Sequence, residues 1–278
     1  MSAHLAEVAE SDARDTVAAT YAEIRATLGL PVVNLVYRHL ATTPGRLEGL
    51  WAALVPCLRT PATRRVAGAV AASVPAPAVD AIPVASLRAT GIDAPVLRAT
   101  AATLDAYDRG NAANLIAVSA LLHGVDAPVG PPAPEAAPET PGPPVLPPMV
   151  APDRLAPGAR ALVEEMSEAI SGPARPLLVP SLFRHLTQPP PLLALAWVVL
   201  RRPVRSPDFD AAVERLVAAA RAALPGLAFG VPPVTDAETR AALERFLGAI
   251  PRMLLVGAML RAALAEGLAG GAVAKAGG

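Results

Sequence analysis

Apolar residues recur at steps of three and four along most of this chain, the spacing of one face of an α-helix. From Asp15 to Leu28 the pattern places Val17, Tyr21 and Ile24 on one face, and Gly29 follows as the expected C-cap. The same periodicity predicts further helices over 32–41, 44–58, a segment after 61, 93–107, 111–122, 159–170, 179–186, 190–200, 208–224, 236–247 and 251–268. We therefore expect an all-α fold with strand content near zero.

Thr43 and Pro44 predict a helix start, because Thr is a good N-cap and Pro suits the first helical position. The 32 prolines otherwise fall mostly between apolar runs, and eleven of them lie between 128 and 152. Each proline removes a backbone donor and fixes φ, so the stretch 127–157 can form neither a helix interior nor a central strand. We expect an extended linker at 127–157 between helical units at 1–126 and 158–278.

The two units are related in sequence. The strings VYRHLATTPGRLEGLW and SLFRHLTQPPPLLALAW align, and both tryptophans and two of the four histidines fall in register. At a constant offset of 146 the matched pairs are Val17–Val163, Ile24–Ile170, Arg38–Arg184, His39–His185, Leu40–Leu186, Pro44–Pro190, Trp51–Trp197, Arg59–Arg205 and Pro61–Pro207. This spacing predicts a duplicated domain. We expect the repeats to pack about a pseudo-twofold axis, with a ligand site at the seam between them.

Composition narrows the function. Lys+Arg and Asp+Glu are both 24, so the chain lacks the basic surplus of a nucleic-acid-binding protein. Cys57 is the single cysteine, which excludes an intrachain disulfide and cysteine-based metal or redox sites. We expect no cofactor and no metal. The acidic N-terminus lacks signal-peptide features and the longest charge-free apolar run, 192–200, is too short for a membrane span. These features predict a cytoplasmic protein without a membrane partner.

The repeated Arg-His pair is the first candidate site. Residues near a pseudo-twofold axis meet their repeat mates, so His39 and His185 could approach each other with Arg38 and Arg184 nearby. Adjacent helical residues point about 100° apart. The pair could instead cap carbonyls or pack at the interface. Tyr37, the aromatic before the first pair, is a further candidate ligand contact, whereas the two tryptophans and Cys57 are expected in the core.

A second polar cluster lies in YDRGNAANLIAVSALL, residues 107–122. It places Asp108, Arg109, Asn111 and Asn114 around a glycine at the start of an apolar run. Asp108 or Asn111 could be an N-cap. A buried asparagine there could instead hold a water or a substrate carboxylate. The sequence contains no GxxxxGK[ST], GxSxG or HExxH motif that would indicate another chemistry.

The run TYAEIRATLGLPVVNLVYRHLATTPGRLEGLWAAL, the later YDRGNAANLIAVSALL and the matching second half resemble the group I 2-haloacid dehalogenases of the DehI type. The resemblance covers most of the chain outside the linker. It implies an all-α fold of two repeats around a buried active site. It also implies attack of an activated water on the carbon that bears the halogen, without a covalent enzyme ester.

The resemblance also implies site residues. The family's water-activating aspartate falls at Leu182, just after Ser181, and a leucine can neither accept a proton nor orient water. A tryptophan of the family's substrate pocket falls at Val32 and a tyrosine at Asn114. The family's asparagine matches Asn111. The sequence thus favours the family's fold and argues against its known reaction.

Three functions stay open from the sequence. The first is an enzyme-like protein that binds a small, anionic organic ligand at the seam, with His39 or His185 as acid–base group. Arg38, Arg184 and Asn111 would then hold a carboxylate. The second is a non-catalytic binding or scaffold protein that lost the dehalogenase base. The third is residual dehalogenation with a substitute base. A homodimer is possible in each case.

Overall fold

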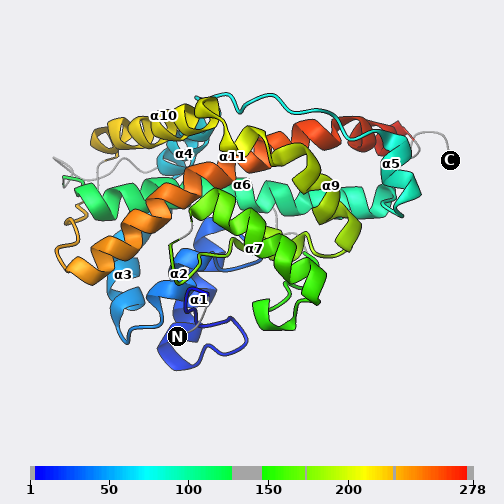
Figure 1. Ribbon diagram of the computed structural model, residues 1–278. Coiled ribbons are helices and arrows are strands. Elements are labelled where there is room, and N and C mark those ends of the chain that lie inside the picture. Colours follow the sequence, from blue (N-terminus) through cyan, green and yellow to red (C-terminus); the bar gives the residue numbers. More distant parts are fainter. Residues whose placement is uncertain (1–3, 127–145, 173, 228–229, 274–278) are drawn as a thin grey trace.

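The computed structural model describes residues 4–126, 146–172, 174–227 and 230–273, and the side chains up to 269. Its longer elements, drawn in Figure 1, are α1 (Asp15–Leu28), α2 (Leu35–Leu40), α3 (Arg46–Leu58), α4 (Pro61–Ala72), α5 (Val84–Ala89), α6 (Ala94–His123), α7 (Pro157–Ser171), α8 (Ser181–His185), α9 (Pro190–Leu200), α10 (Pro207–Ala223) and α11 (Ala237–Val273). Short 3-10 turns lie at η1 (Pro152–Arg154), η2 (Pro203–Arg205) and η3 (Leu224–Gly226). Within these ranges, β structure is limited to the isolated bridges His4–Leu177 and Val125–Val231, so the all-α prediction is confirmed.

Local capping explains several helix boundaries. Gly29 has φ 62° and ends α1 at its predicted residue, because glycine adopts the left-handed conformation without a Cβ clash. The Thr60 and Ser206 side chains accept from the backbone N–H groups three residues on and begin α4 and α10. The predicted start at Thr43 and Pro44 is wrong. Gly45 has φ 74°, which breaks helical geometry there, and α3 begins at Arg46.

Two long helices replace pairs of shorter predicted ones. Segments 93–107 and 111–122 form the single helix α6, so neither Asp108 nor Asn111 is an N-cap. Gly110, which suggested a break, lies inside the helix, and a Cβ there would stand 2.9 Å from Leu30 Cδ1. The glycine therefore serves close packing. Likewise α11 continues through Pro251, where two helices were expected. The pattern also missed α5.

The pair α6 and α11 forms the centre of the molecule and makes its most extensive helix–helix contact. In Figure 1 the two helices run side by side across the structure, with α1 to α3 below them and α4 and α10 above. Helix α10 touches α4, α6 and α11, and α7 and α9 pack on α11. Trp51 and Trp197 are buried, as expected, and Cys57 is fully buried.

Helix α11 is long and apolar enough to cross a membrane by length and composition, over Ala237–Ala269. Its apolar window is 67 % buried inside the protein, which is the behaviour of a core helix packed against other helices. A cytoplasmic location stays a prediction.

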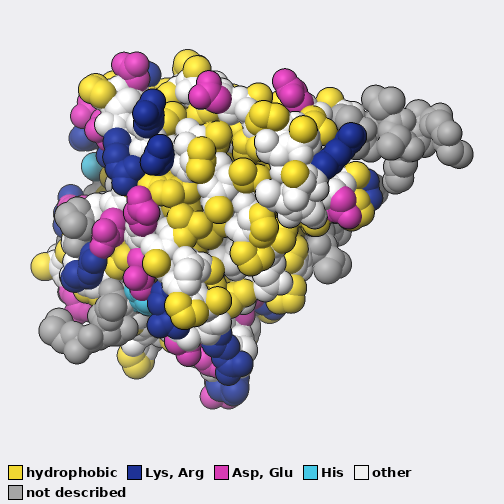
Figure 2. All heavy atoms as spheres, turned by 45° about the vertical axis from the view of Figure 1, so that its right-hand side comes forward, with side chains coloured by type: hydrophobic (Ala, Val, Ile, Leu, Met, Phe, Trp, Pro, Cys, Tyr) yellow, Lys and Arg dark blue, Asp and Glu magenta, His cyan; other side chains and the backbone are white. Residues whose placement is uncertain are grey.

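The surface mixes apolar and charged side chains. On the face in Figure 2, hydrophobic side chains occupy the centre, and many charged ones gather toward its left and lower edges. Val198 is a large apolar side chain that is 64 % exposed, and single residues of this kind are normal on protein surfaces. Of the predicted linker, residues 127–145 lie outside the described part, and 146–157 run to the start of α7.

Candidate functional site

A cavity of about 50 Å³ lies between α2, α6, α8 and α11. That volume has room for about four water-sized groups. Its walls are Asn34, Leu35, Val36, Tyr107, Asn111, Asn114, Leu178, Pro180, Ser181, Leu182, Phe246, Ala249, Ile250 and Met253. Each of these residues is buried. The cavity is therefore small and lies among buried residues of both halves of the chain.

Both halves of the chain build this cavity. Residues 34–36 at the start of α2 and residues 180–182 at the start of α8 line it together, and the two trios are separated by the offset of 146 found in the sequence. Tyr107, Asn111 and Asn114 come from α6, and the opposite wall comes from α11. The cavity thus lies between the segments that the sequence pairs as repeat mates, while the duplication itself stays a prediction.

The polar wall on α6 follows from helix geometry. Residues 107, 111 and 114 are spaced by four and three, which puts Tyr107, Asn111 and Asn114 on one face of the helix. The amide oxygens of Asn34 and Asn114 are buried without a hydrogen-bond partner. An unsatisfied buried polar atom costs about 1–3 kcal/mol. These two amides therefore leave hydrogen-bonding capacity at the cavity that a ligand or water would use.

A chain of hydrogen bonds runs behind the wall. Arg38 Nη2 donates to Ser181 Oγ at 2.7 Å. Ser181 also forms a side-chain hydrogen bond with Tyr107, which acts to lower the pKa of the Tyr107 phenol. Tyr107 Oη lies 2.8 Å from His185 Nδ1. Because Ser181 and Tyr107 line the cavity, this chain links the cavity wall to Arg38 and His185.

His185 is held in its neutral form. Burial lowers its pKa to about 4, and the charges of Arg184 and Arg38 act in the same direction, against a backbone hydrogen bond with Pro147. The Pro147 bond favours a proton on Nε2, which leaves Nδ1 as acceptor for the Tyr107 hydroxyl. Burial also raises the pKa of Tyr107. The Tyr107–His185 pair is therefore a neutral phenol that donates to a neutral imidazole.

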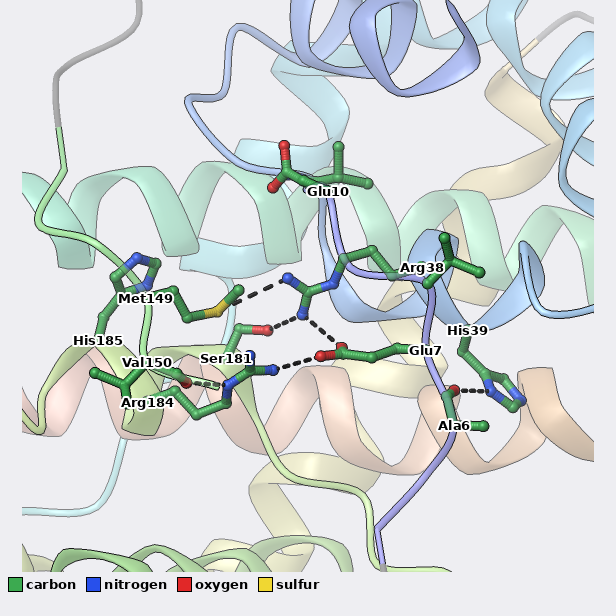
Figure 3. A network of polar contacts seen from close by, with 12 residues as sticks. Ala6, Glu7, Glu10, Arg38, His39, Met149, Val150, Ser181, Arg184 and His185 are labelled. Carbon is green, nitrogen blue, oxygen red and sulfur yellow. Dashed lines mark hydrogen bonds and ion pairs between the residues drawn. The ribbon is translucent and has the colours of Figure 1, made fainter. Parts of the chain in front are cut away.

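The two arginines of the repeated pair meet at one carboxylate, as Figure 3 shows. Glu7 lies 3.0 Å from Arg38 through Oε2 and 2.7 Å from Arg184 through Oε1. Arg184 Nε also donates to the Val150 carbonyl at 2.8 Å, and Arg38 contacts Met149 Sδ. Both guanidinium groups are buried behind the cavity and share this single carboxylate.

The histidines lie in different surroundings. His39 is half-buried, bonds through Nδ1 with the Ala6 carbonyl at 2.8 Å, and lies against the Phe246 ring of α11. Burial lowers its pKa as well. His185 is buried against Tyr107 of α6, with ring centroids 5.6 Å apart. The structure does not bring the two imidazoles together, and each packs on an aromatic ring of the long helix from the other half.

The other candidates divide into three groups. Asn111, Asn114, Ser181 and Leu182 line the cavity. Arg38, Arg184 and His185 lie behind it. Tyr37 and Val32 are not among its walls. Tyr37 is buried in edge-on contact with Trp51, with ring centroids 5.6 Å apart, and Val32 packs on the hydrophobic core.

Sequence reasoning missed Asn34, Tyr107 and Glu7. Asn34 is the polar residue in an apolar run, directly before a segment whose repeat mate carries Ser181, which is a readable signal. Tyr107 lies on the same helix face as Asn111 and Asn114. A prediction of one continuous helix over this segment would have grouped the three side chains. Glu7 has no local signal, because its partners lie far along the chain.

The described cavity walls contain amides, two hydroxyls and apolar side chains, with no carboxylate and no imidazole among them. Amide N–H groups can donate to an anionic oxygen, and the hydroxyl and amide oxygens can accept from a ligand hydroxyl. Direct proton abstraction by the described walls would have to use Tyr107, whose proton is bound toward His185. The arrangement is thus suited first to binding a small polar molecule.

Comparisons with known proteins agree with this architecture. No protein-family model matches the chain. The (R)-2-haloacid dehalogenase of Pseudomonas putida is 46 % identical over 55 residues, which span 20 % of this chain and only 18 % of that relative. Crystal structures of a D-2-haloacid dehalogenase mutant, alone and with D-2-CPA, match with a TM-score of 0.75 at 18 % identity, over 95 % of this chain and 96 % of theirs. A complex of D-2-haloacid dehalogenase with L-LA gives a TM-score of 0.74. These findings support the resemblance to the group I 2-haloacid dehalogenases, and at this identity they establish the fold.

Proposed function

We propose that this chain, which has the fold of the D-2-haloacid dehalogenases, binds a small organic acid in the cavity between α2, α6, α8 and α11. The observation that carries the proposal is the pair of buried amide oxygens, of Asn34 and Asn114, that have no hydrogen-bond partner on the wall of one cavity. Buried polar groups are normally satisfied, so such a pair indicates a missing partner.

The cavity's chemistry supports a ligand class. The unpartnered amide oxygens of Asn34 and Asn114 can accept from a ligand hydroxyl. Asparagine N–H groups can donate to a carboxylate, and the hydrogen of Tyr107 is directed to His185. The apolar walls leave space for a short carbon chain. A 2-hydroxy acid of two or three carbons matches this set of donors, acceptors and volume.

The residues that line the cavity favour ligand binding without catalysis. Leu182 occupies the position where the resemblance places the water-activating aspartate. The described wall residues include no aspartate or glutamate that could replace it. The two-repeat organisation with the site at its seam is part of this proposal, supported by the equivalent trios 34–36 and 180–182.

Titration of the labelled protein with L-lactate, followed by NMR chemical shifts, tests binding. We expect saturable shifts for α2, α6 and α8 with lactate and weaker ones with propionate, which lacks the hydroxyl. Asn114→Leu removes an amide with a side chain of similar size and should weaken lactate binding at least tenfold. Ser119→Ala, a buried change on the same helix away from the cavity walls, is the matched control. Unchanged lactate affinity in Asn114→Leu would overturn the proposal.

The Tyr107–His185 hydrogen bond favours one second function, hydrolysis with a substitute base. A water bound at Tyr107 would pass a proton to Tyr107 while Tyr107 passes its own to His185 Nδ1. With 2-chloropropionate the water oxygen would bond to carbon 2 and chloride would leave. Chloride release that is lost in both Tyr107→Phe and His185→Gln, with lactate binding retained in His185→Gln, whose residue does not line the cavity, would support this function. Absence of chloride release from the wild-type chain would exclude it.

A further inference from the structure

The small cavity raises the question of how a ligand reaches it. The cavity is narrow and every wall residue is buried, so a ligand must pass between buried side chains to reach it. A second, wider cleft of about 530 Å³ lies on the outer side of one wall. It is formed by the end of α7, η2, α10 and the middle of α11.

The two spaces meet at a pair of residues. Leu178 and Ala249 line both the small cavity and the wide cleft. Leu178 belongs to the irregular segment between α7 and α8, whereas Ala249 is fixed on α11. Leu178 is a flexible side chain outside the helices, although it is buried, and Ala249 presents only a methyl group. The barrier between cleft and cavity is therefore one side chain thick.

Charged groups surround the wide cleft. Arg205, Arg245 and Arg252 contribute three positive charges, and Asp210 and Glu244 contribute two negative ones. Arg252 pairs with Asp210 at 2.6 Å, Arg205 with Glu165 at 3.8 Å, and Glu244 with Arg240 at 3.1 Å. Arg245 donates to the Pro176 carbonyl at 2.6 Å. Arg245 therefore carries a positive charge that no carboxylate of the cleft is shown to neutralise. Clefts with a surplus of one sign attract ligands of the opposite sign.

We propose that the wide cleft is the entrance to the small cavity, that Leu178 and Ala249 form its gate, and that the entrance selects small anions such as short organic acids. This inference rests on the proposed binding function and adds to it the route and the residues that control entry. It predicts that entry slows when Ala249 is enlarged and quickens when Leu178 is truncated.

Alkylation of a cysteine placed in the cavity measures entry without knowledge of the natural ligand. Leu182→Cys puts a thiol on the cavity wall, and Met253→Cys gives a second position that lines the cavity but not the cleft. Native Cys57 should react slowly with the reagent, because it is fully buried and burial raises the pKa of its thiol to about 12. Iodoacetate and iodoacetamide are nearly equal in size and differ in charge. In both reactions the thiolate sulfur bonds to the reagent's carbon and iodide leaves.

The gate is tested with paired variants in the Leu182→Cys background. Ala249→Leu should slow alkylation of Cys at position 182 at least tenfold, and Leu178→Ala should speed it severalfold. Gly248→Leu adds the same side chain one residue away, where a Cβ meets open space in the cleft, and should change the rate less than twofold. Equal rates in the Ala249→Leu and Gly248→Leu proteins would overturn the gate. The same comparison in the Met253→Cys background guards against a folding defect of the first reporter.

The charge preference is tested by the ratio of the iodoacetate rate to the iodoacetamide rate. Relative to the same ratio in urea-unfolded protein, we expect the folded ratio to be roughly threefold higher and to fall as salt is added. A folded ratio at or below the unfolded one would overturn the anion preference. These outcomes are separate from the lactate titration: gated alkylation with no lactate binding would remove the proposed ligand and keep the entrance.

Discussion

Glu7 Oε1 lies 2.7 Å from Arg184 Nη1, and this ion pair joins the N-terminal segment to α8 across most of the chain's length. The other oxygen of Glu7 pairs with Arg38 of α2. One carboxylate thus bridges two buried guanidinium groups that are separated in the sequence by the offset of 146. Its position explains how two like charges remain close together behind an apolar cavity.

Glu7→Ala should therefore destabilise the protein strongly. It leaves two buried positive charges uncompensated, and breaking a buried ion pair in this way costs about 3–5 kcal/mol. Urea unfolding followed by circular dichroism measures the change. Glu164→Gln removes the carboxylate that meets His4 in a partly exposed pair, and it should cost less than about 1 kcal/mol. Equal effects of the two changes would show that Glu7 does not hold the arginines together.

His185 should make stability depend on pH. Its folded pKa is about 4 and its unfolded value is 6.5, so between these pH values the unfolded chain binds a proton that the folded chain does not. The free energy of unfolding therefore rises with pH across this window. The contribution of His185 totals about 3 kcal/mol and does not change above pH 6.5. His185→Gln keeps an acceptor for Tyr107 and should remove most of this slope.

The control is His123→Gln, which changes an exposed histidine at the end of α6. Unfolding free energies of the three proteins are compared from pH 7 to pH 4.5. If His185→Gln retained the full wild-type slope, the neutral state of His185 would not be the source of the pH dependence.

Gly257→Ala should disrupt the contact between α6 and α11. A Cβ at position 257 would overlap Asp108 Oδ1, and Asp108 is held by Arg261 through its other oxygen at 2.9 Å and 2.6 Å. Overpacking of this kind costs about 1–3 kcal/mol. Gly248→Ala on the same helix meets open space and should be neutral or stabilising by less than about 1 kcal/mol. Thermal unfolding of both variants gives the comparison, and a Gly257→Ala protein as stable as Gly248→Ala would contradict the close packing.

Leu182→Asp tests the resemblance to the dehalogenases directly. It introduces a carboxylate at the cavity wall beside Ser181, where the resemblance places the water-activating base. We expect measurable chloride release from 2-chloropropionate above the wild-type level. Val36→Asp puts the same group on the same cavity from the equivalent position in the first half and should stay inactive. Chloride release from both variants or from neither would contradict the assignment of position 182.

Local pattern alone was sufficient for much of the helical structure. The bounds of α1 and α9 match the prediction, because their apolar periodicity ends at clear signals, Gly29 and the flanking prolines. The offset of 146 predicts a duplication, and positions 34–36 and 180–182, which line one cavity, are separated by that offset. Breaks at Gly110 and Pro251 were predicted wrongly because helix-breaking propensity is weak beside the burial of α6 against α11.

Tertiary structure decided the rest of the site. The charge balance and the Arg-His pairs did not reveal that Glu7 occupies both arginines, because that contact joins residues more than 170 positions apart. The sequence also could not show that His39 and His185 have different surroundings. His39 packs on Phe246 of α11 and His185 on Tyr107 of α6, and these contacts exist only in the folded protein. The periodicity of the sequence determines which face of each helix is apolar. The packing of segments that are distant in the sequence determines which polar groups meet and where the cavity forms.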